Sequence, residues 1–494
     1  MSTPVTAPPA GAAPAPTPAG PGATPAVPPA APPPAGRPRR RRTVPSRIRL
    51  LAGVGVAAVA LLFTATALTI GNARDGLQVI GHDAGPQVVA TADLYFALSD
   101  MDAQVANVLL IGREVGLGKG RQEALNRYDQ RRAEASRAVL QAAELAIGDG
   151  TEQMTVRSVL DGLGRYERLA AQAILLDEQA GHPAGPPPQR VIDLYRQATD
   201  LMRLDLLPKA YNLTLDSGTI VRKTYEEESS AVTTGRGLVI VAGFGTILVL
   251  VGLQVYLARR FRRVTNPALV AATVAVAVLT VSAASLLTTE AAELRMANDD
   301  GFTSVLALSR ARAIGNTMHG DQSRYLLDPE RADTYEQVYL DKSQSVLYTP
   351  GGNLEKYYAG VDKAVGGYRD RPDFLGFLGA EAANITLPGQ RAAVREVLGD
   401  YRDFQFQDRA MRLDVQRDQV RSAIALRMGP LAGAFENYDK ELVGLIDLHK
   451  DAFDQAIRDG DDALSGWDLI LPGAAVLAVL LILAGVAPRL SEYR

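Results

Sequence analysis

The sequence has no cysteine and only four histidines in 494 residues. The absence of cysteine excludes disulfide bonds, thiolate metal ligands and a cysteine nucleophile. The formal net charge is only −3, so no global excess of positive charge indicates a nucleic-acid partner. The motifs H-E-x-x-H, the P-loop and G-x-S-x-G are also absent. We therefore expect no catalytic residue, no cofactor and no metal site, and we predict that the protein is not an enzyme.

Charged residues are missing from four long apolar segments. A bilayer core about 30 Å thick needs roughly 20 apolar helical residues to cross it. Four segments meet this requirement without any Asp, Glu, Lys, Arg or His: 50–70, 237–257, 268–288 and 469–487. They predict an integral membrane protein with four transmembrane helices in membrane lipid. Ion pathways usually need ionisable groups inside the bilayer, which disfavours a transporter or channel.

Small residues in these segments indicate that the four helices pack closely. Gly53 and Gly55 lie in the first segment, and Gly243 and Gly245 lie in the second. Such residues let helix backbones approach one another in lipid. Nearly fifty residues precede the first segment, so we interpret it as an uncleaved anchor and not as a signal peptide.

Arginine residues cluster on one side of the apolar segments. They cluster before the first segment and in the short link between the second and third: Arg39, Arg40, Arg41, Arg42, Arg259, Arg260, Arg262 and Arg263. Short loops rich in Lys and Arg stay in the cytoplasm. We therefore predict a multi-pass protein of the cell (plasma) membrane with both termini in the cytoplasm and two large extracytoplasmic segments.

The chain then divides into a repeated plan of span, outer domain and span. The tail, rich in Pro and Ala, is expected to be disordered, as either a tether for a partner or a solvated spacer. The predicted parts are the tail 1–49, transmembrane helix 50–70, four-helix outer domain 71–236, transmembrane helix 237–257, Arg-rich link 258–267, transmembrane helix 268–288, helical outer domain 289–468, transmembrane helix 469–487 and C-terminus 488–494.

Apolar residues recur at helical spacing in both outer segments. In the first, Leu94, Leu98, Met101, Val105 and Val108 are spaced four and three residues apart, which is typical of a bundle helix. A Gly-Pro-rich break at 181–188 precedes a fourth helix that we expect to run into the second span, with a kink at Pro208. In the second, we predict helices over 290–327, 388–427 and 431–464. The predicted fold class is all-α, with two extracytoplasmic helical-bundle domains.

A short internal match supports duplication. VLDGLGRYERL (159–169) and VREVLGDYRDF (394–404) place Leu163 and Tyr166 against Leu398 and Tyr401 at equal spacing. Both stretches lie beyond the middle of their outer domains, so the two domains are expected to share one design.

The polar residues of the outer domains form no convincing reactive group. His319 and His449 each lie alone on a charged helix, where a solvated or packed role is more common than a ligand role. The acids between Asp451 and Asp462 lack the alternating ligand spacing of a calcium loop, and we interpret them as a solvated face beside the membrane. The ligand or partner site stays unknown from the sequence.

Two motifs resemble a known family of four-span membrane proteins. The segment ADLYFALSDMDAQVANVLLIG (92–112) resembles a helix of the actinobacterial GlnX family, and RYLLD (324–328) resembles the first helix of its second outer domain. The resemblance covers 45–494 in architecture. It implies amino-acid sensing, in which a periplasmic solute-binding lipoprotein engages the outer domains and a cytoplasmic serine/threonine kinase of the G type receives the signal. The family has no catalytic residues to carry over.

These observations favour a transmembrane signal-relay protein. The predicted inner parts are the tail, a ten-residue link and a short C-terminus, so the signal is expected to pass to a separate kinase. The alternative is a non-catalytic scaffold of the cell envelope or of a secretion complex, which the same architecture would serve. Bundle helices with exposed seams often dimerise, which makes a homodimer a further expectation.

Overall fold

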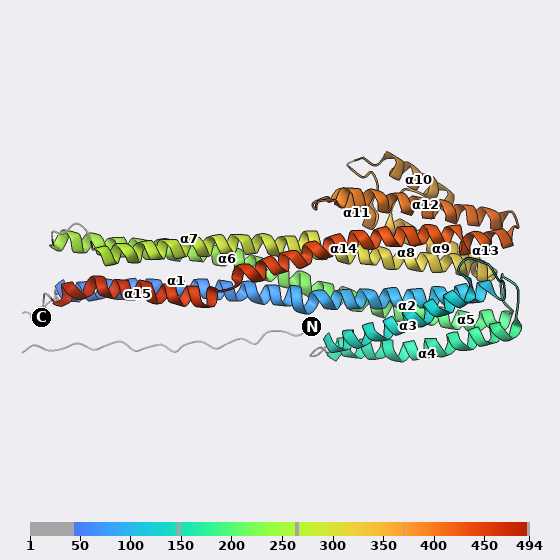
Figure 1. Ribbon diagram of the computed structural model, residues 1–494, viewed down its shortest axis with the longest axis horizontal. Helices are drawn as coiled ribbons and strands as arrows, with labels where there is room; N and C mark the ends of the chain where they lie inside the picture. Colours follow the sequence, from blue (N-terminus) through green and yellow to red (C-terminus); the bar gives the residue numbers. More distant parts are fainter. Residues whose placement is uncertain (1–43, 146–149, 262–265, 370, 492–494) are drawn as a thin grey trace, which may run out of the picture.

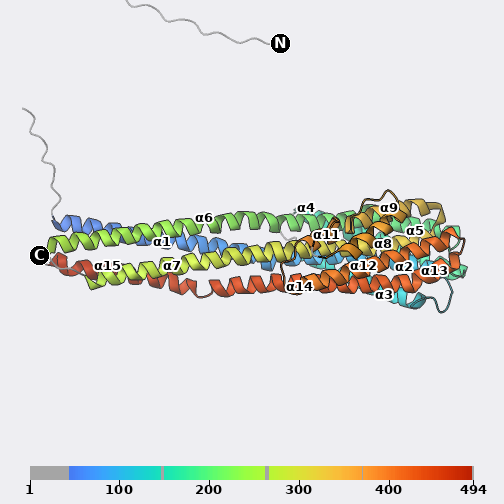
Figure 2. The same ribbon diagram turned by 90° about the horizontal axis from the view of Figure 1, so that it is seen from above.

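The computed structural model describes residues 44–145, 150–261, 266–369 and 371–491. It is a long rod of helices with a thin end and a thicker end (Figures 1 and 2). The described residues contain no β-strand, and a single antiparallel bridge joins Tyr348 to Leu375. The predicted all-α class is therefore confirmed.

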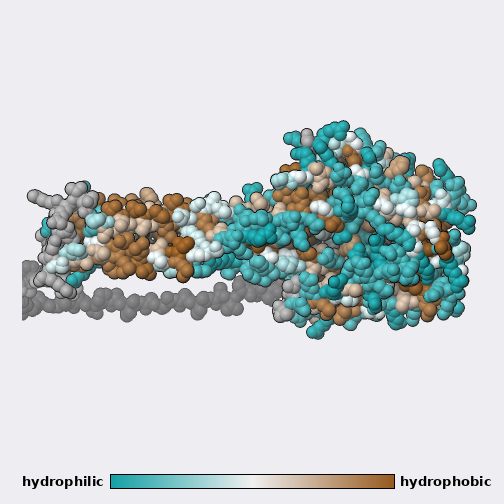
Figure 3. Space-filling view, in the orientation of Figure 1, coloured by the Kyte–Doolittle hydropathy of each residue, from teal (hydrophilic) through white to brown (hydrophobic). Residues whose placement is uncertain are grey.

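The thin end is a bundle of four helices that are long and apolar enough to cross a membrane. These are α1 (Val44–Leu77), α6 (Leu207–Phe261), α7 (Pro267–Arg295) and α15 (Trp467–Ser491), and each contains one predicted span. α1 packs against α6 and α15, and α7 packs against the same two helices. On the face shown in Figure 3, apolar side chains form a band across this bundle, as a lipid-facing surface requires.

Close packing inside this bundle depends on particular small and polar residues. A Cβ atom added at Gly243 would lie 2.3 Å from the side chain of Thr280, so α6 and α7 meet where α6 has no side chain. Gln254 Nε2 donates to Leu269 O at 3.0 Å and to Thr273 Oγ1 at 2.8 Å, which also ties α6 to α7. The close-packing prediction is confirmed at Gly243. It is wrong at Gly53 and Gly245, whose missing side chains would meet no atom within 4 Å.

Helices continue from the membrane bundle into the outer body. α1 passes through a π-helix, η1 (Gln78–Ala84), into α2 (Gly85–Ile111), and α7 passes through η3 (Met296–Phe302) into α8 (Thr303–Leu327). η1 and η3 are both seven residues long and both follow the first helix of their half. This equivalence supports the predicted duplication.

The other two connections differ from each other. α5 (Gln189–Leu201) continues through η2 (Met202–Leu206) into the 55-residue α6. Pro208 has no N–H and so removes one helical hydrogen bond. At the position of the predicted kink the structure has the π-helix η2, directly before this proline. α14 (Pro430–Leu464) is followed by Ser465 and then by Gly466, whose φ is +79°, before α15 begins.

The first half of the outer body is the predicted bundle. It contains α2, α3 (Gly120–Leu145), α4 (Gly150–Ala180) and α5, with α2 against α3 and α4 against α5. The predicted seam of α2 is fully buried, and so are Leu163 and Tyr166 on α4. Their counterparts Leu398 and Tyr401 are buried on α12, in agreement with the internal match.

The second half is built from α8, a short 3₁₀ turn η4 (Pro329–Arg331), α9 (Ala332–Val346), α10 (Leu354–Gly367), α11 (Gly376–Ala383), α12 (Gln390–Gln416), α13 (Val420–Met428) and α14. The prediction of one helix over 388–427 is wrong. Asp418 adopts a φ of 61°, a left-handed conformation that Asp tolerates better than most residues, and it separates α12 from α13.

The two outer segments share one hydrophobic core. α2 packs directly against α8, and the same apolar cluster includes Met101 from the first half and Met318 from the second. The helices of both halves lie alongside one another at the thick end of the rod (Figure 2). The outer part of the protein is therefore a single body made of two related halves, and its centre is the α2–α8 seam.

Candidate functional site

Polar side chains are fully buried along the α2–α8 seam. Every residue of α2 from Phe96 to Ile111 and of α8 from Gly315 to Arg324 is buried. Buried polar groups need hydrogen-bond partners, since an unpaired one costs free energy. The buried polar residues of the two stretches are Ser99, Asp100, Asp102, Gln104, Asn107, Asn316, Thr317, His319, Asp321, Gln322, Ser323 and Arg324.

An ion network joins the two halves. Asp102 on α2 lies 2.5 Å from Arg324 on α8, and the exposed fraction of either side chain is at most 2%. Arg324 also pairs with Asp321 at 2.6 Å, and Lys342 on α9 reaches Asp321 at 2.5 Å. Burial alone would raise the pKa of Asp321, but the charges of Lys342 and Arg324 outweigh it and lower that pKa. Thr199 on α5 donates to Asp102 Oδ2 at 2.6 Å.

Two tyrosines extend this network into the first half. Tyr166 on α4 donates to Asp102 Oδ1 at 3.1 Å, and Arg324 Nε donates to the hydroxyl of Tyr195 at 3.1 Å. Burial first, and then the negative charge of Asp102, raise the pKa of the Tyr166 hydroxyl, so it stays a donor. Helices α2, α4, α5, α8 and α9 therefore meet at a network of two carboxylates, Asp102 and Asp321, around the guanidinium of Arg324.

A second set of contacts crosses the seam on both sides of Asp102 along α2. Asn316 Nδ2 donates to Ser99 Oγ at 2.8 Å, and Ser323 Oγ donates to Asn107 Oδ1 at 2.7 Å. Arg427, on the short helix α13, donates through Nη2 to the same Asn107 oxygen at 3.2 Å and to His319 O at 2.8 Å. The break at Asp418 therefore has a structural role, because it lets α13 turn Arg427 toward the seam.

A cavity of about 350 Å³ lies beside these contacts. This volume falls in the range of roughly 300–1,000 Å³ that is typical of small-molecule sites. The walls come from α2, α3, α8, α13 and α14 and from the turn between α2 and α3. The charged and amide side chains that line it are Asp100, Gln104, Asn107, Lys119, Glu123, Arg127, Arg131, Asn316, Arg427, Glu436, Asp439 and Lys440.

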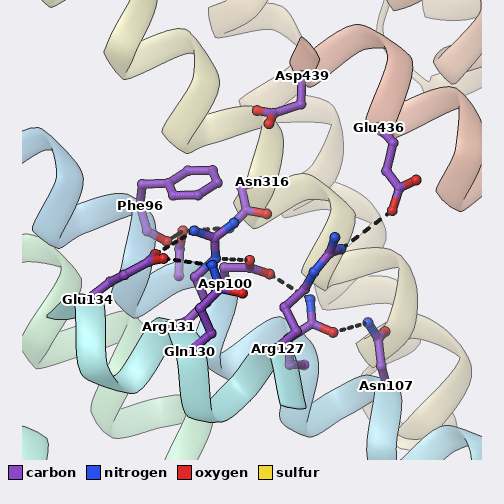
Figure 4. A network of polar contacts seen from close by, with 12 residues as sticks. Phe96, Asp100, Asn107, Arg127, Gln130, Arg131, Glu134, Asn316, Glu436 and Asp439 are labelled. Atoms are coloured by element: carbon purple, nitrogen blue, oxygen red, sulfur yellow. Dashed lines mark hydrogen bonds and ion pairs between the residues drawn. The ribbon is translucent and has the colours of Figure 1, made fainter. Parts of the chain in front are cut away.

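The two arginines that α3 contributes to the cavity lining form ion pairs with carboxylates. Arg131 lies 2.6 Å from Asp100 and 2.5 Å from Glu134. Arg127 lies 3.5 Å from Glu436, which joins α3 to α14. Figure 4 shows these pairs side by side, with Phe96 and Asn316 next to them.

Arg427 differs from the other cations of the cavity. Its exposed fraction is 1%, yet no carboxylate lies within ion-pair distance of it among the described residues. Its buried Nε has no hydrogen-bond partner in that part of the chain. Burial without an anion lowers the pKa of Arg427 to about 9. Burial at this site disfavours the positive charge of the guanidinium, but an arginine side chain keeps its proton in proteins.

His319 lies on the same wall. Its ring stacks on Phe435 with 4.2 Å between centroids, and its buried Nδ1 has no partner among the described residues. Burial lowers the pKa of His319 well below the usual value, so the ring is neutral at physiological pH. The stacked ring agrees with the interpretation of His319 as a packed residue, and its Nδ1 is a buried polar atom without a partner among the described residues.

His449 is also packed, on α14. Its Nε2 lies 2.7 Å from Glu381 Oε1 on α11, and its Nδ1 faces the backbone oxygen of Asp300 in η3. Burial alone would lower the pKa of His449, but the hydrogen bond and charge of Glu381 outweigh it and raise that pKa. Both ring nitrogens face acceptors, which favours the imidazolium form.

The raised pKa of His449 predicts a pH dependence of stability. A histidine whose pKa is raised in the folded state stabilises the protein fully below its unfolded pKa of about 6.5 and loses this contribution as pH rises through the folded pKa. We expect the melting temperature of the wild type to fall as pH rises through the raised folded-state pKa of His449. The variant His449→Gln should not show this loss. The matched control is His82→Gln, whose pair with Asp461 is half-exposed and should leave the pH profile unchanged.

The arginines singled out in the sequence lie far from this cavity. Arg259 and Arg260 are exposed in the last turn of α6, at the end of the membrane bundle that lies farthest from the outer body. Arg39, Arg40, Arg41, Arg42, Arg262 and Arg263 lie outside the described residues. The orientation that they predict stays a prediction. Within the described ranges, no cluster of His, Asp or Glu has the arrangement of a metal site.

Sequence reasoning missed the cavity and its residues. The available signal was the polar series Asp100, Asp102, Gln104 and Asn107, which interrupts an otherwise apolar stretch of α2. Asp100, Gln104 and Asn107 share one face of the helix and Asp102 lies on the opposite face, which indicates that the helix is buried among polar partners on two sides. Those partners are far away in the sequence, so this pattern could not identify them.

The family comparison matches the first half. Residues 76–226, which include α2 to α5 and the outer part of α6, match the model of the family described as an actinobacterial sensor domain. No curated protein and no solved structure matches the chain. The match does not test the GlnX type. The first half of the outer body is therefore similar to an actinobacterial sensor domain, which indicates a sensing role.

Proposed function

We propose that this protein is a transmembrane signal-relay protein that passes extracytoplasmic amino-acid status to a cytoplasmic kinase. The observation that carries the proposal is the continuity of helices between the outer body and the membrane bundle. Pro45–Ile111 and Gln189–Arg260 form helical runs of 67 and 72 residues, and Pro267–Leu327 forms one of 61. At about 1.5 Å per residue, such a run reaches through the bilayer and along the outer body.

The polar seam supports a role in switching. Hydrogen bonds and ion pairs between α2 and α8 have discrete partners, so the seam can hold defined arrangements instead of deforming gradually. A change in the outer body would reach the membrane through α1 and α7, which continue into the two seam helices. The match of residues 76–226 to a sensor domain supports this direction of signalling.

The proposed partners rest on the family resemblance and on the shortness of the predicted cytoplasmic link. The link 258–267 between the second and third predicted spans is ten residues long, too short for a folded domain. We therefore assign the output to a separate serine/threonine kinase and the input to a periplasmic solute-binding lipoprotein that docks on the outer body.

Affinity purification from the native host tests this function. The tagged full chain is isolated in mild detergent with and without added glutamate or aspartate, and the bound proteins are identified by mass spectrometry. We expect a solute-binding lipoprotein and a soluble kinase, with amounts that change with the amino acid. Recovery of envelope or secretion components alone, unchanged by amino acids, would instead support the scaffold alternative.

A further inference from the structure

The side chains that line the cavity beside the α2–α8 seam include one more basic than acidic residue. Of the charged side chains that line it, five are basic and four are acidic. Lys119 and Arg127 share Glu436, Arg131 pairs with Asp100, and Lys440 pairs with Glu441. Arg427 is the cation that has no carboxylate among the described residues.

A buried guanidinium without a paired anion is costly, because burial removes its hydration and the more distant carboxylates Asp408 and Asp100 offset that loss only in part. The cost disappears when an anion occupies the cavity beside it. Arginine offers donors in a planar fork that matches a carboxylate. The buried Nε of Arg427 and the buried Nδ1 of His319 are the polar atoms of this wall that lack partners among the described residues.

The remaining walls indicate an organic ligand. Phe96, Ile111, Met428 and Phe435 line the same space, and its volume of about 350 Å³ is several times that of an inorganic anion. Apolar walls with a few convergent polar groups are the usual surroundings of a small organic molecule. An anion with an apolar body therefore fits better than phosphate.

We propose that this cavity binds a small organic carboxylate, whose carboxylate group pairs with Arg427 and whose apolar part lies against Phe96 and Phe435. The ligand would contact both halves of the outer body at once, because the cavity walls come from α2 and α3 on one side and from α8, α13 and α14 on the other. The proposal deepens the proposed sensing function by adding direct ligand binding. It is tested by binding alone, so it can fail while the relay function stands.

Binding to the purified full chain in mild detergent tests the site. Butyrate is the carboxylate probe, and butyramide is its uncharged counterpart of nearly equal size. 2-Aminobutyrate adds an ammonium group, and inorganic phosphate tests for a simple anion site. Isothermal titration calorimetry gives affinity, and thermal unfolding gives the shift in melting temperature. We expect butyrate or 2-aminobutyrate to bind and to raise the melting temperature, and butyramide to do neither.

Removal of the guanidinium distinguishes a binding role from a structural one. In Arg427→Met, we expect carboxylate affinity to fall at least about tenfold, the loss expected when a charge-assisted hydrogen bond is removed. The melting temperature of the unliganded variant should stay equal or rise, because an unpaired buried charge is gone. Arg427→Gln serves as a second uncharged variant if Arg427→Met does not fold.

The matched control is Arg409→Met, which removes the same charge from an exposed pair with Glu355 outside the cavity. It should bind carboxylates like the wild type. Three results would overturn the proposal: equal binding of butyrate and butyramide, binding of phosphate alone, or unchanged carboxylate affinity in both Arg427 variants.

Discussion

Replacement of Arg324 by methionine is expected to destabilise the outer body by about 3–5 kcal/mol, the usual cost of breaking a buried ion pair by removing one partner. Asp102 would lose its cation, and the hydroxyl of Tyr195 would lose a donor. Asp321 would keep only Lys342. Urea unfolding of the full chain in detergent, followed by circular dichroism, measures the change.

A double variant separates the pair from the rest of the network. Asp102→Asn combined with Arg324→Met should lose less stability than the two single changes added together, since neither charge is left without its partner. Arg409→Met provides the comparison for an exposed pair and should cost no more than about 1 kcal/mol. A loss of this small size for Arg324→Met would mean that the seam is not held by the ion network.

Interruption of α6 is expected to abolish the relay. Glu226 is exposed on α6 between the outer body and the second span, so proline at this position breaks the helix at a cost of about 3 kcal/mol or more without disturbing a core contact. We expect Glu226→Pro to remove the glutamate-dependent change in phosphorylation by the kinase. The outer body should still recover the solute-binding lipoprotein in affinity purification.

Glu226→Ala is the matched control, because it removes the same side chain and keeps the helix. It should signal like the wild type, and both variants should reach the membrane in equal amounts. Normal signalling by Glu226→Pro would show that the continuity of α6 is not needed for the relay.

The helical parts of the fold were largely predictable from the sequence. The four spans follow from the absence of charge over about twenty residues, a signal that does not depend on distant contacts. The seam of α2 follows from local spacing in the same way, and Leu94 and Met101 are buried as that spacing predicts. Such patterns arise because one helix face must meet a core, whatever that core contains.

The relation between the two halves was not predictable. Asp102 and Arg324 are separated by more than two hundred residues, and nothing local to either indicates its partner. The helix end at Gln416 was missed for a related reason. Arg417, Asp418 and Gln419 carry no Gly or Pro signal, and the left-handed backbone of Asp418 places Arg427 in the seam by tertiary contacts. The cavity depends on both features, so no candidate site could be read from the sequence.

The π-helices η1 and η3 have a consequence for rotation. The hydrogen bonds of a π-helix span one more residue than those of an α-helix, and one residue of an α-helix corresponds to about 100° around its axis. Each π-helix therefore determines how the seam helix is rotated about its axis relative to the membrane span that precedes it. If a single residue were deleted from η1, α2 would turn by this angle, and the carboxylate of Asp102 would face away from Arg324. The two π-helices thus fix the rotation of α2 and α8 about their axes, so that the polar residues of the two seam helices face each other.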